Sequence, residues 1–212
     1  MILTSLAVVG GIAVLCGAAQ VITKITSRDP LAGLGQPVAA VAGTPSAPAP
    51  TWKAPNMLTD PRPELEIRHE LEEWLLKSAG VAAPMKSRCD EPAGFSGGSA
   101  AKFPCTVTYG KLAVTYQVST KPSSSLTFTW DATAAQTVVT RTGILAAVAG
   151  RFRTDGGRFS EVRCEELPEV ALVPTGKALP QHCYVRIEGQ AKTAWIDVIP
   201  TRSELQLDTR LQ

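Results

Sequence analysis

Residues 105–120 read Cys-Thr-Val-Thr-Tyr-Gly-Lys-Leu-Ala-Val-Thr-Tyr-Gln-Val-Ser-Thr, and this stretch decides the fold. Two runs rich in Val, Thr and Tyr flank the dipeptide Gly110-Lys111. Runs of this composition favour β-strands, and a two-residue connection that contains Gly is typical of a tight hairpin turn. We therefore expect an antiparallel hairpin here.

The chain carries this pattern twice. A second hairpin begins at Cys183, is rich in Val and Ile, and turns at Gly189-Gln190. Upstream of each hairpin lies another cysteine in a similar setting, Arg88-Cys89-Asp90-Glu91 and Arg163-Cys164-Glu165-Glu166, about 75 residues apart. We predict two repeated modules of the α+β class, each a helix packed on a small antiparallel sheet with one disulfide.

The helix of each module is predicted from its apolar period. Ile67, Leu71, Trp74 and Leu75 form one face of a helix over residues 63–79, which begins at Pro63 and stops at Gly80. The acidic residues Glu70, Glu72 and Glu73 are expected outside. The second helix is expected to begin at Asp131 as N-cap and to run to about Arg153, with Val138 on its buried face.

These elements divide the chain into four parts. We predict a transmembrane anchor over residues 1–24 and a Pro/Ala/Gly-rich linker over 25–62 that stays extended or disordered. The first module then covers residues 63–130 and the second covers 131–212.

The anchor prediction rests on the uncharged run from Ile2 to Ile22, which as a helix spans about 30 Å, the thickness of a bilayer core. A cleaved signal peptide is the alternative, but no Lys or Arg precedes the run. Small residues at helical spacing are candidates for helix packing in the membrane, although Gly and Ala are also simply common there. These residues are Ala7, Gly10, Gly11, Ala13 and Gly17.

The cysteines and the flanking charges give opposite orientations. Lys24 and Arg28 follow the apolar run, and the positive-inside rule alone would put the rest of the chain in the cytoplasm. Disulfides persist outside the cytosol, and this signal is stronger than two charges. We therefore expect a single-pass cell-membrane protein whose C-terminal part is extracytoplasmic.

Four cysteines allow three disulfide pairings, and the repeat favours pairing within each copy. This predicts Cys89 with Cys105 and Cys164 with Cys183, each contributing about 3 kcal/mol in the chain-entropy model. The alternative is a zinc site of four cysteines, which the absence of a Cys-x-x-Cys pair disfavours. The same absence disfavours redox catalysis.

One short motif has the pattern of a hydrolase nucleophile, Gly94-Phe95-Ser96-Gly97-Gly98. That motif needs a strand before it and a helix after it, whereas here Pro92 precedes it inside a loop between two cysteines. His69 and His182 are candidate bases, but nothing in the sequence orients either of them. A flexible loop is the interpretation that we favour.

Three further features are weaker candidates for binding. The acidic pairs Asp90-Glu91 and Glu165-Glu166 would suit a cation or a basic partner, although we favour solvated turns with local ion pairs. Trp52 lies in the linker and is a candidate for docking on a partner or on lipid headgroups. No catalytic residue, cofactor or metal is predicted.

The repeated motifs also resemble a known family. An Arg-Cys-(Asp/Glu)-Glu opening, a second cysteine that leads a Val/Thr strand, and a glycine turn resemble a small disulfide-containing domain of unknown function. That domain occurs in actinobacterial membrane-anchored envelope proteins and lipoproteins. The resemblance covers roughly Pro63 to Leu207, and the second copy departs from it by a longer loop and by His182 where the first has Pro104. It implies an envelope location and no particular activity.

These observations predict a function of the binding class. With a net charge of +2 and no Lys/Arg-rich run, nucleic acid is not an expected partner. We expect a non-catalytic, membrane-anchored accessory or interaction subunit of a bacterial envelope or membrane complex, with the lipid bilayer and an envelope or membrane protein as partners. The alternatives are a module that binds envelope polymer or lipid, and an inhibitor or hydrolase at the outer membrane face.

Overall fold

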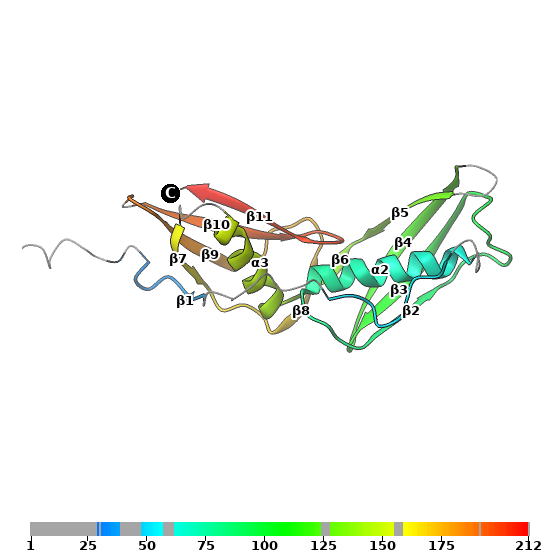
Figure 1. Cartoon of the computed structure of the whole chain (residues 1–212), viewed down its shortest axis with the longest axis horizontal. Helices are drawn as coiled ribbons and strands as arrows, with labels where there is room; N and C mark the ends of the chain where they lie inside the picture. Colours follow the sequence, from blue (N-terminus) through cyan, green and yellow to red (C-terminus); the bar gives the residue numbers. More distant parts are fainter. Residues whose placement is uncertain are drawn as a thin grey trace, which may run out of the picture.

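The protein is built of two lobes joined by a small sheet (Figure 1). The computed structural model describes residues 29, 31–38, 48–56, 62–123, 128–154, 159–190 and 192–211. Within these ranges the chain forms two helices and three antiparallel sheets of five, four and two strands. Each lobe has its own hydrophobic core, and these cores correspond to the two sequence repeats.

The first lobe is a four-stranded sheet with one helix across it. The elements are α2 (Pro63–Ala79), β2 (Met85–Cys89), β3 (Ala101–Tyr109), β4 (Leu112–Pro122) and β5 (Phe128–Ala134), and the strands lie in this order. The predicted hairpin is confirmed, because β3 and β4 pair from Tyr109↔Leu112 outward. Gly110 holds φ at 58° in the two-residue turn, which is a backbone conformation that suits glycine.

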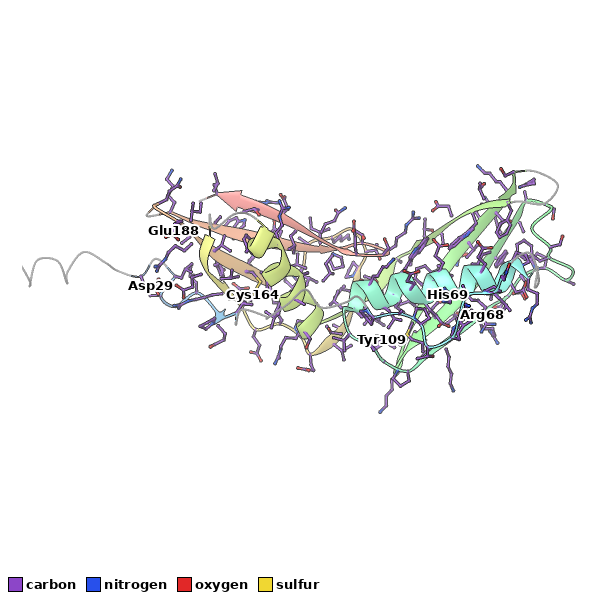
Figure 2. The ribbon with its side chains drawn as sticks, viewed as in Figure 1. Asp29, Arg68, His69, Tyr109, Cys164 and Glu188 are labelled. Atoms are coloured by element: carbon purple, nitrogen blue, oxygen red, sulfur yellow. A yellow bond between two sulfur atoms is a disulfide. The ribbon has the colours of Figure 1, made fainter. Side chains whose placement is uncertain are left out.

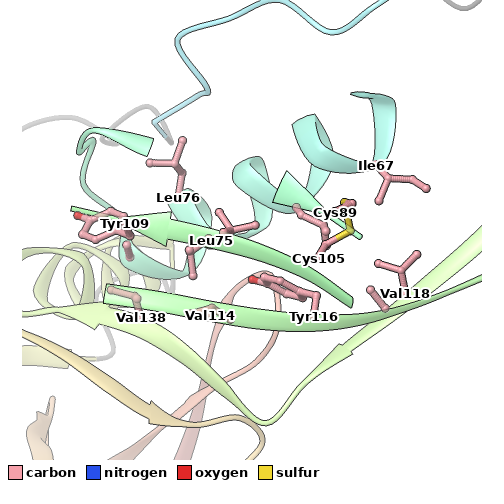
Figure 3. Close-up of a cluster of buried hydrophobic side chains, with 14 of the residues drawn as sticks. Ile67, Leu75, Leu76, Cys89, Cys105, Tyr109, Val114, Tyr116, Val118 and Val138 are labelled. Atoms are coloured by element: carbon pink, nitrogen blue, oxygen red, sulfur yellow. A yellow bond between two sulfur atoms is a disulfide. The ribbon is translucent and has the colours of Figure 1, made fainter. Parts of the chain in front are cut away.

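Helix α2 has the predicted bounds and stop. Gly80 has a left-handed backbone and its N–H donates to the Leu76 carbonyl over 2.8 Å, closing the last turn. Ile67, Leu71 and Leu75 are fully buried against the sheet. Figure 3 shows this core, in which helix side chains lie over the Cys89–Cys105 disulfide and the ring of Tyr116.

The second lobe repeats the plan with an additional edge. Its elements are α3 (Arg141–Thr154), β7 (Phe159–Cys164), β9 (His182–Ile187), β10 (Thr193–Pro200) and β11 (Leu205–Leu211). A two-residue strand from the linker, β1 (Gln36–Pro37), joins the sheet, whose order is β1-β7-β9-β10-β11. Ile144 and Val148 of α3 pack on Val185 and Ile196 of the sheet.

A third sheet connects the lobes, and it corrects one prediction. β6 (Gln136–Thr140) pairs with β8 (Val170–Pro174), and Figure 1 shows both between the lobes. The second helix was expected from Asp131, but Asp131 lies inside β5 and Val138 lies in β6, so α3 begins ten residues later than predicted. Val138 packs into the first core and its neighbour Val139 into the second, because successive strand residues point to opposite faces.

The lobes meet at a buried polar junction. The Thr140 hydroxyl donates to the Ala79 carbonyl over 2.7 Å and accepts from the Gly143 N–H over 2.9 Å. The buried Ser78 hydroxyl donates to the Val138 carbonyl over 3.1 Å. A Cβ on Gly143 would lie 2.1 Å from the Ala79 oxygen, so only glycine allows this approach of α3 to the end of α2.

Much of the predicted linker is folded against the two modules. Leu31 is fully buried, and the Val38 N–H donates to the Val162 carbonyl over 2.9 Å beside the β1–β7 pair. Residues 48–56 carry Trp52 onto α2 of the other lobe. The prediction of an extended or disordered linker is therefore wrong for residues 31–38 and 48–56.

The predicted fold class is corrected as well. Strands hold 45% of the described residues and helices 19%, so the protein is mainly antiparallel β-sheet and not an evenly mixed α+β protein. No helix in the described ranges has the length and apolar character needed to cross a membrane. The predicted N-terminal transmembrane helix, residues 1–24, and its packing positions Ala7, Gly10, Gly11, Ala13 and Gly17 lie outside the described residues.

Candidate functional site

The structure contains both predicted disulfides. Cys89 is bonded to Cys105 and Cys164 to Cys183, in each case between directly opposed residues of neighbouring antiparallel strands. The zinc-site alternative is excluded for these cysteines because their sulfurs are bonded to each other. Over the described ranges, no group of three or more His, Cys, Asp and Glu side chains is placed to hold a metal ion.

The second lobe carries a distinctive surface on the sheet face opposite α3, which we call the aromatic face. Cys183 and Val185 of β9 point into the core, so Tyr184 between them points outward, as does Trp195 of β10. Strand register places Arg163, Tyr184, Trp195 and Arg210 in one continuous row across β7, β9, β10 and β11. Each of the four is partly or largely exposed. The aromatic face consists of this row and the neighbouring His182 and Asp197.

His182 and Asp197 fix one side of the row. The His182 ring stacks on Trp195 with centroids 5.7 Å apart, and its Nδ1 lies 3.1 Å from Oδ1 of Asp197. Arg210 Nε lies 2.9 Å from the other Asp197 oxygen. Asp197 is buried at 4% exposure and contacts the half-buried His182 and the exposed Arg210, so it orients both of them.

Glu165, the residue that follows β7, orients Tyr184 in the row. Its two oxygens accept hydrogen bonds from the Tyr184 hydroxyl over 2.7 Å and from the His182 backbone N–H over 3.0 Å. The Tyr184 bond, followed by the His182 bond, lowers the pKa of Glu165. The same bond, with some burial, raises the pKa of Tyr184 to about 12. Glu165 is therefore a hydrogen-bond acceptor that orients Tyr184, and both of its carboxylate oxygens already have a donor.

An ion-pair cluster closes the β7 end of the face. Arg163 Nη2 lies 2.9 Å from Oδ2 of Asp29 and 2.8 Å from Oε1 of Glu161, and Arg186 pairs with the other Asp29 oxygen. The Leu31 backbone N–H, together with both arginines, lowers the pKa of Asp29. Figure 2 shows Asp29 at the end of the molecule that also holds Cys164. Asp29 of the linker thus places a negative charge beside the aromatic face.

The equivalent surface of the first lobe has a different character. Thr106 follows Cys105 as Tyr184 follows Cys183, and Thr106 is paired with Thr115 where Tyr184 is paired with Trp195. The arginine before the first cysteine also differs, because the side chain of Arg88 is 79% exposed and that of Arg163 only 19%. The first lobe therefore provides an internal reference for the second, in which the half-buried Thr106 and the exposed Thr115 replace the aromatic pair.

The residues of the hydrolase hypothesis are not brought together. Ser96 is exposed in the loop between β2 and β3, with no helix after it. His69 lies on α2 of the first lobe, where Figure 2 labels it, and His182 lies on β9 of the second. No hydrogen bond between Ser96 and either histidine occurs in the described part of the chain. The loop instead packs through Phe95 on the rings of Phe103 and Phe128.

Trp52 docks on the protein itself. Its indole N–H donates to Oε2 of Glu72 over 2.7 Å, and its ring meets His69 edge-on with centroids 5.0 Å apart. Glu72 is 2% exposed and also accepts a 2.5 Å bond from the Ser87 hydroxyl. The prediction that Glu72 stays outside is therefore wrong. Trp52 belongs to an internal clasp between the linker and α2.

Comparison with known proteins gives no further guide, since no family model, curated protein or solved structure matches this chain. The assignment of a site therefore rests on geometry. The sequence predicts a hairpin that contains Tyr184 and Trp195 and assigns neither of them a role in binding, although a signal for them was present. In a hairpin that turns at Gly189-Gln190, strand alternation puts both rings on the same outward face.

Proposed function

We propose that the chain is an extracytoplasmic, non-catalytic binding protein whose aromatic face docks a partner protein. The observation that carries this proposal is the row Arg163–Tyr184–Trp195–Arg210. Trp, Tyr and Arg dominate the energetics of protein interfaces, and Lys is depleted there. The row contains the first three types and no Lys, whereas Lys86, Lys102 and Lys121 lie on exposed positions of the first lobe's sheet.

The rigidity of the face supports the same proposal. Tyr184 is fixed by Glu165, His182 by Asp197 and Trp195, and Arg210 by Asp197. Side chains that are already ordered lose less conformational entropy when they bind, which favours affinity.

The two disulfides support the location. Structural disulfides persist in oxidising compartments outside the cytoplasm and are rare within it. Both pairs are buried between opposed strands and match the repeat, as expected of staples in small modules. An extracytoplasmic partner, such as another protein of the cell envelope, follows from this location.

The proposal is tested by comparing matched pairs of substitutions on the two lobes of the full chain. Cells that express the tagged protein are treated with a short cross-linker, and co-purified proteins are quantified. Tyr184→Ala with Trp195→Ala should lower the recovery of the partner roughly tenfold or more, as for hot-spot residues. Thr106→Ala with Thr115→Ala should leave it unchanged. Equal loss with both pairs, or loss with neither, would contradict the proposed surface.

A further variant separates binding from hydrolysis. Ser96→Ala should leave recovery of the partner and the cellular phenotype unchanged, because Ser96 is exposed and apart from both histidines. A folded Ser96→Ala protein without function would reopen the hydrolase alternative, since removal of a nucleophile costs orders of magnitude in rate.

A further inference from the structure

The edge strand β11 is self-complementary about Thr209. Residues 207–211 read Leu-Asp-Thr-Arg-Leu. If two copies of this strand pair antiparallel about a two-fold axis at Thr209, Asp208 of each lies opposite Arg210 of the other. In the same register Leu207 lies opposite Leu211. Oppositely charged and apolar cross-strand pairs are the units that stabilise a sheet, and a two-fold axis provides each pair twice.

The other edge of this strand is open. β11 is the last strand of its sheet and pairs only with β10 among the described strands. Proteins often protect an edge strand from pairing with a bulge, a Lys or a Pro. The seven pairs of β11 with β10 run without a bulge, and β11 contains neither Lys nor Pro. The unprotected edge therefore offers backbone N–H and C=O groups for a further strand.

An exposed side chain also points to a partner at this edge. Leu211 is 74% exposed. Among the described residues, Val170 is the other exposed large hydrophobic residue, at 46%. Leu211 pairs with Ala194 and so projects from the same face as Leu207, on the side of α3. A groove of about 680 Å³ lies beside β11 on this side, lined by Ala147 and Arg151 of α3 and by Leu205 and Leu207. In the two-fold register, Leu211 of the second copy would lie opposite Leu207, which lines this groove.

We infer that the protein forms a two-fold dimer through β11, in which the two five-stranded sheets become one. The occupant of the edge is a second copy of this chain, because the register that places Asp208 of one copy opposite Arg210 of the other also pairs Leu207 with Leu211. The axis is perpendicular to the sheet, so the two aromatic faces lie on the same side of the dimer. The inference rests on the edge of the sheet and is independent of the proposed binding function.

Site-specific cross-linking tests the register directly. The full chain is prepared in a Cys16→Ser background, in which the disulfide-bonded cysteines leave no other thiol. With Thr209→Cys, the two new thiols face each other at the axis, and mild oxidation should give a covalent dimer. Thr133→Cys is the matched control, because Thr133 is exposed on β5, the edge strand of the other lobe. It should stay monomeric under the same conditions.

The association constant gives a second readout. Asp208→Arg places like charges opposite each other across the axis, so the dimer dissociation constant measured by sedimentation should rise roughly tenfold or more. Asp208 is exposed, so this change leaves the core of the lobe intact. A monomeric full chain at all concentrations would overturn the inference. So would equal cross-linking at residues 133 and 209, or a dimer that Asp208→Arg does not weaken.

Discussion

At the scale of single residues, Glu72 shows how a buried carboxylate organises distant parts of the chain. It is 2% exposed, and its two oxygens accept bonds from Trp52 and Ser87, which come from the linker and from β2. Ser87 in turn accepts a 3.1 Å bond from Arg68 Nε. A buried charge costs free energy unless its bonds are complete, so each donor matters more than an average surface contact.

Removal of one donor should therefore be measurable. Trp52→Phe keeps most of the ring and loses the indole N–H, so it should lower the free energy of unfolding by about 1.5–3 kcal/mol, as for a hydrogen bond to a charged group. The same change should cost much less in a Glu72→Gln background. Denaturant unfolding of the four proteins gives the coupling energy, with Lys53→Ala as an exposed control. A coupling energy near zero would show that the clasp does not hold in solution.

The tyrosines provide a second test at this scale. The chain has three, and all have a raised pKa: Tyr116 and Tyr109 through burial, and Tyr184 first through its bond to Glu165, to about 12. The folded state thus holds these protons more tightly than the unfolded state, whose tyrosines have a pKa of about 10. Stability from these groups is complete below about pH 10 and is lost as the pH rises through the raised pKa values, of which that of Tyr184 is about 12.

A spectrophotometric titration of the phenolate band checks this directly. The native protein should show no tyrosine that ionises near pH 10, and ionisation should coincide with alkaline unfolding or follow it. Tyr184→Phe should remove one of the three groups and leave the rest of the curve in place. A tyrosine in the native protein with a midpoint near 10 would contradict the bonding described here.

At the scale of elements, the linker strand β1 depends on one glycine. Gly35 has φ at +63°, and a Cβ there would lie 2.3 Å from the carbonyl oxygen of Cys164. Gly33 also has a positive φ of +82°, but nothing lies within 4 Å of the position of its Cβ. The two glycines therefore separate backbone strain from a steric clash.

Gly35→Ala should detach β1 from β7, whereas Gly33→Ala should only strain it. Hydrogen exchange of the Val38 amide reports this, because its N–H donates to the Val162 carbonyl. We expect its protection to fall roughly tenfold or more with Gly35→Ala, in line with the loss of about 1.4 kcal/mol or more of local stability. Similar exchange in both variants would mean that contact with Cys164 does not limit the docking.

Helix α3 contains two glycines that allow a controlled comparison. Gly143 lies at the junction of the lobes, and Gly150 is the control. Gly143→Ala would force a Cβ to 2.1 Å from the Ala79 carbonyl, while Gly150 has nothing within 4 Å of its Cβ position. The first change should lower the free energy of unfolding by about 2 kcal/mol or more, through overpacking. The second should raise it by about 0.5–1 kcal/mol, because Ala is the better helix former. Thermal unfolding of both variants measures these changes in stability. Equal effects of the two substitutions would show that the junction is not closely packed.

The elements also show which parts of the fold the sequence could predict. Helix α2 and the two central hairpins were accessible, because each has a strong apolar period and a local stop or turn at Gly80, Gly110 or Gly189. β6, β1 and the part of β5 beyond Trp130 were not, because their structure depends on partners far along the chain. Asp131 reads as a helix N-cap but lies in a strand that pairs with β4, and Val138 and Val139 fit a helix pattern but separate two cores.

At the scale of the whole molecule, the linker and the junction join the two repeats. The linker runs from β1 on the second lobe to Trp52 on the first, and Val138 and Val139 connect the cores. The features of the candidate site also differ in whether the sequence could predict them. The disulfides could be predicted because the repeat is visible in the sequence. The aromatic face needed the strand register, since Arg163 and Arg210 join the hairpin residues only through tertiary pairing.

Photo-cross-linking in living cells tests the central claim, that the aromatic face of the second lobe binds a partner protein. A photoreactive phenylalanine analogue is placed at Tyr184 in one protein and at Thr106, the equivalent position of the first lobe, in another. We predict that the Tyr184 protein gives a cross-linked band with one other protein, that the Thr106 protein gives none, and that Trp195→Ala abolishes the band. A band from the Thr106 protein alone, or a cross-link from the Tyr184 protein only to glycan or lipid, would contradict the account.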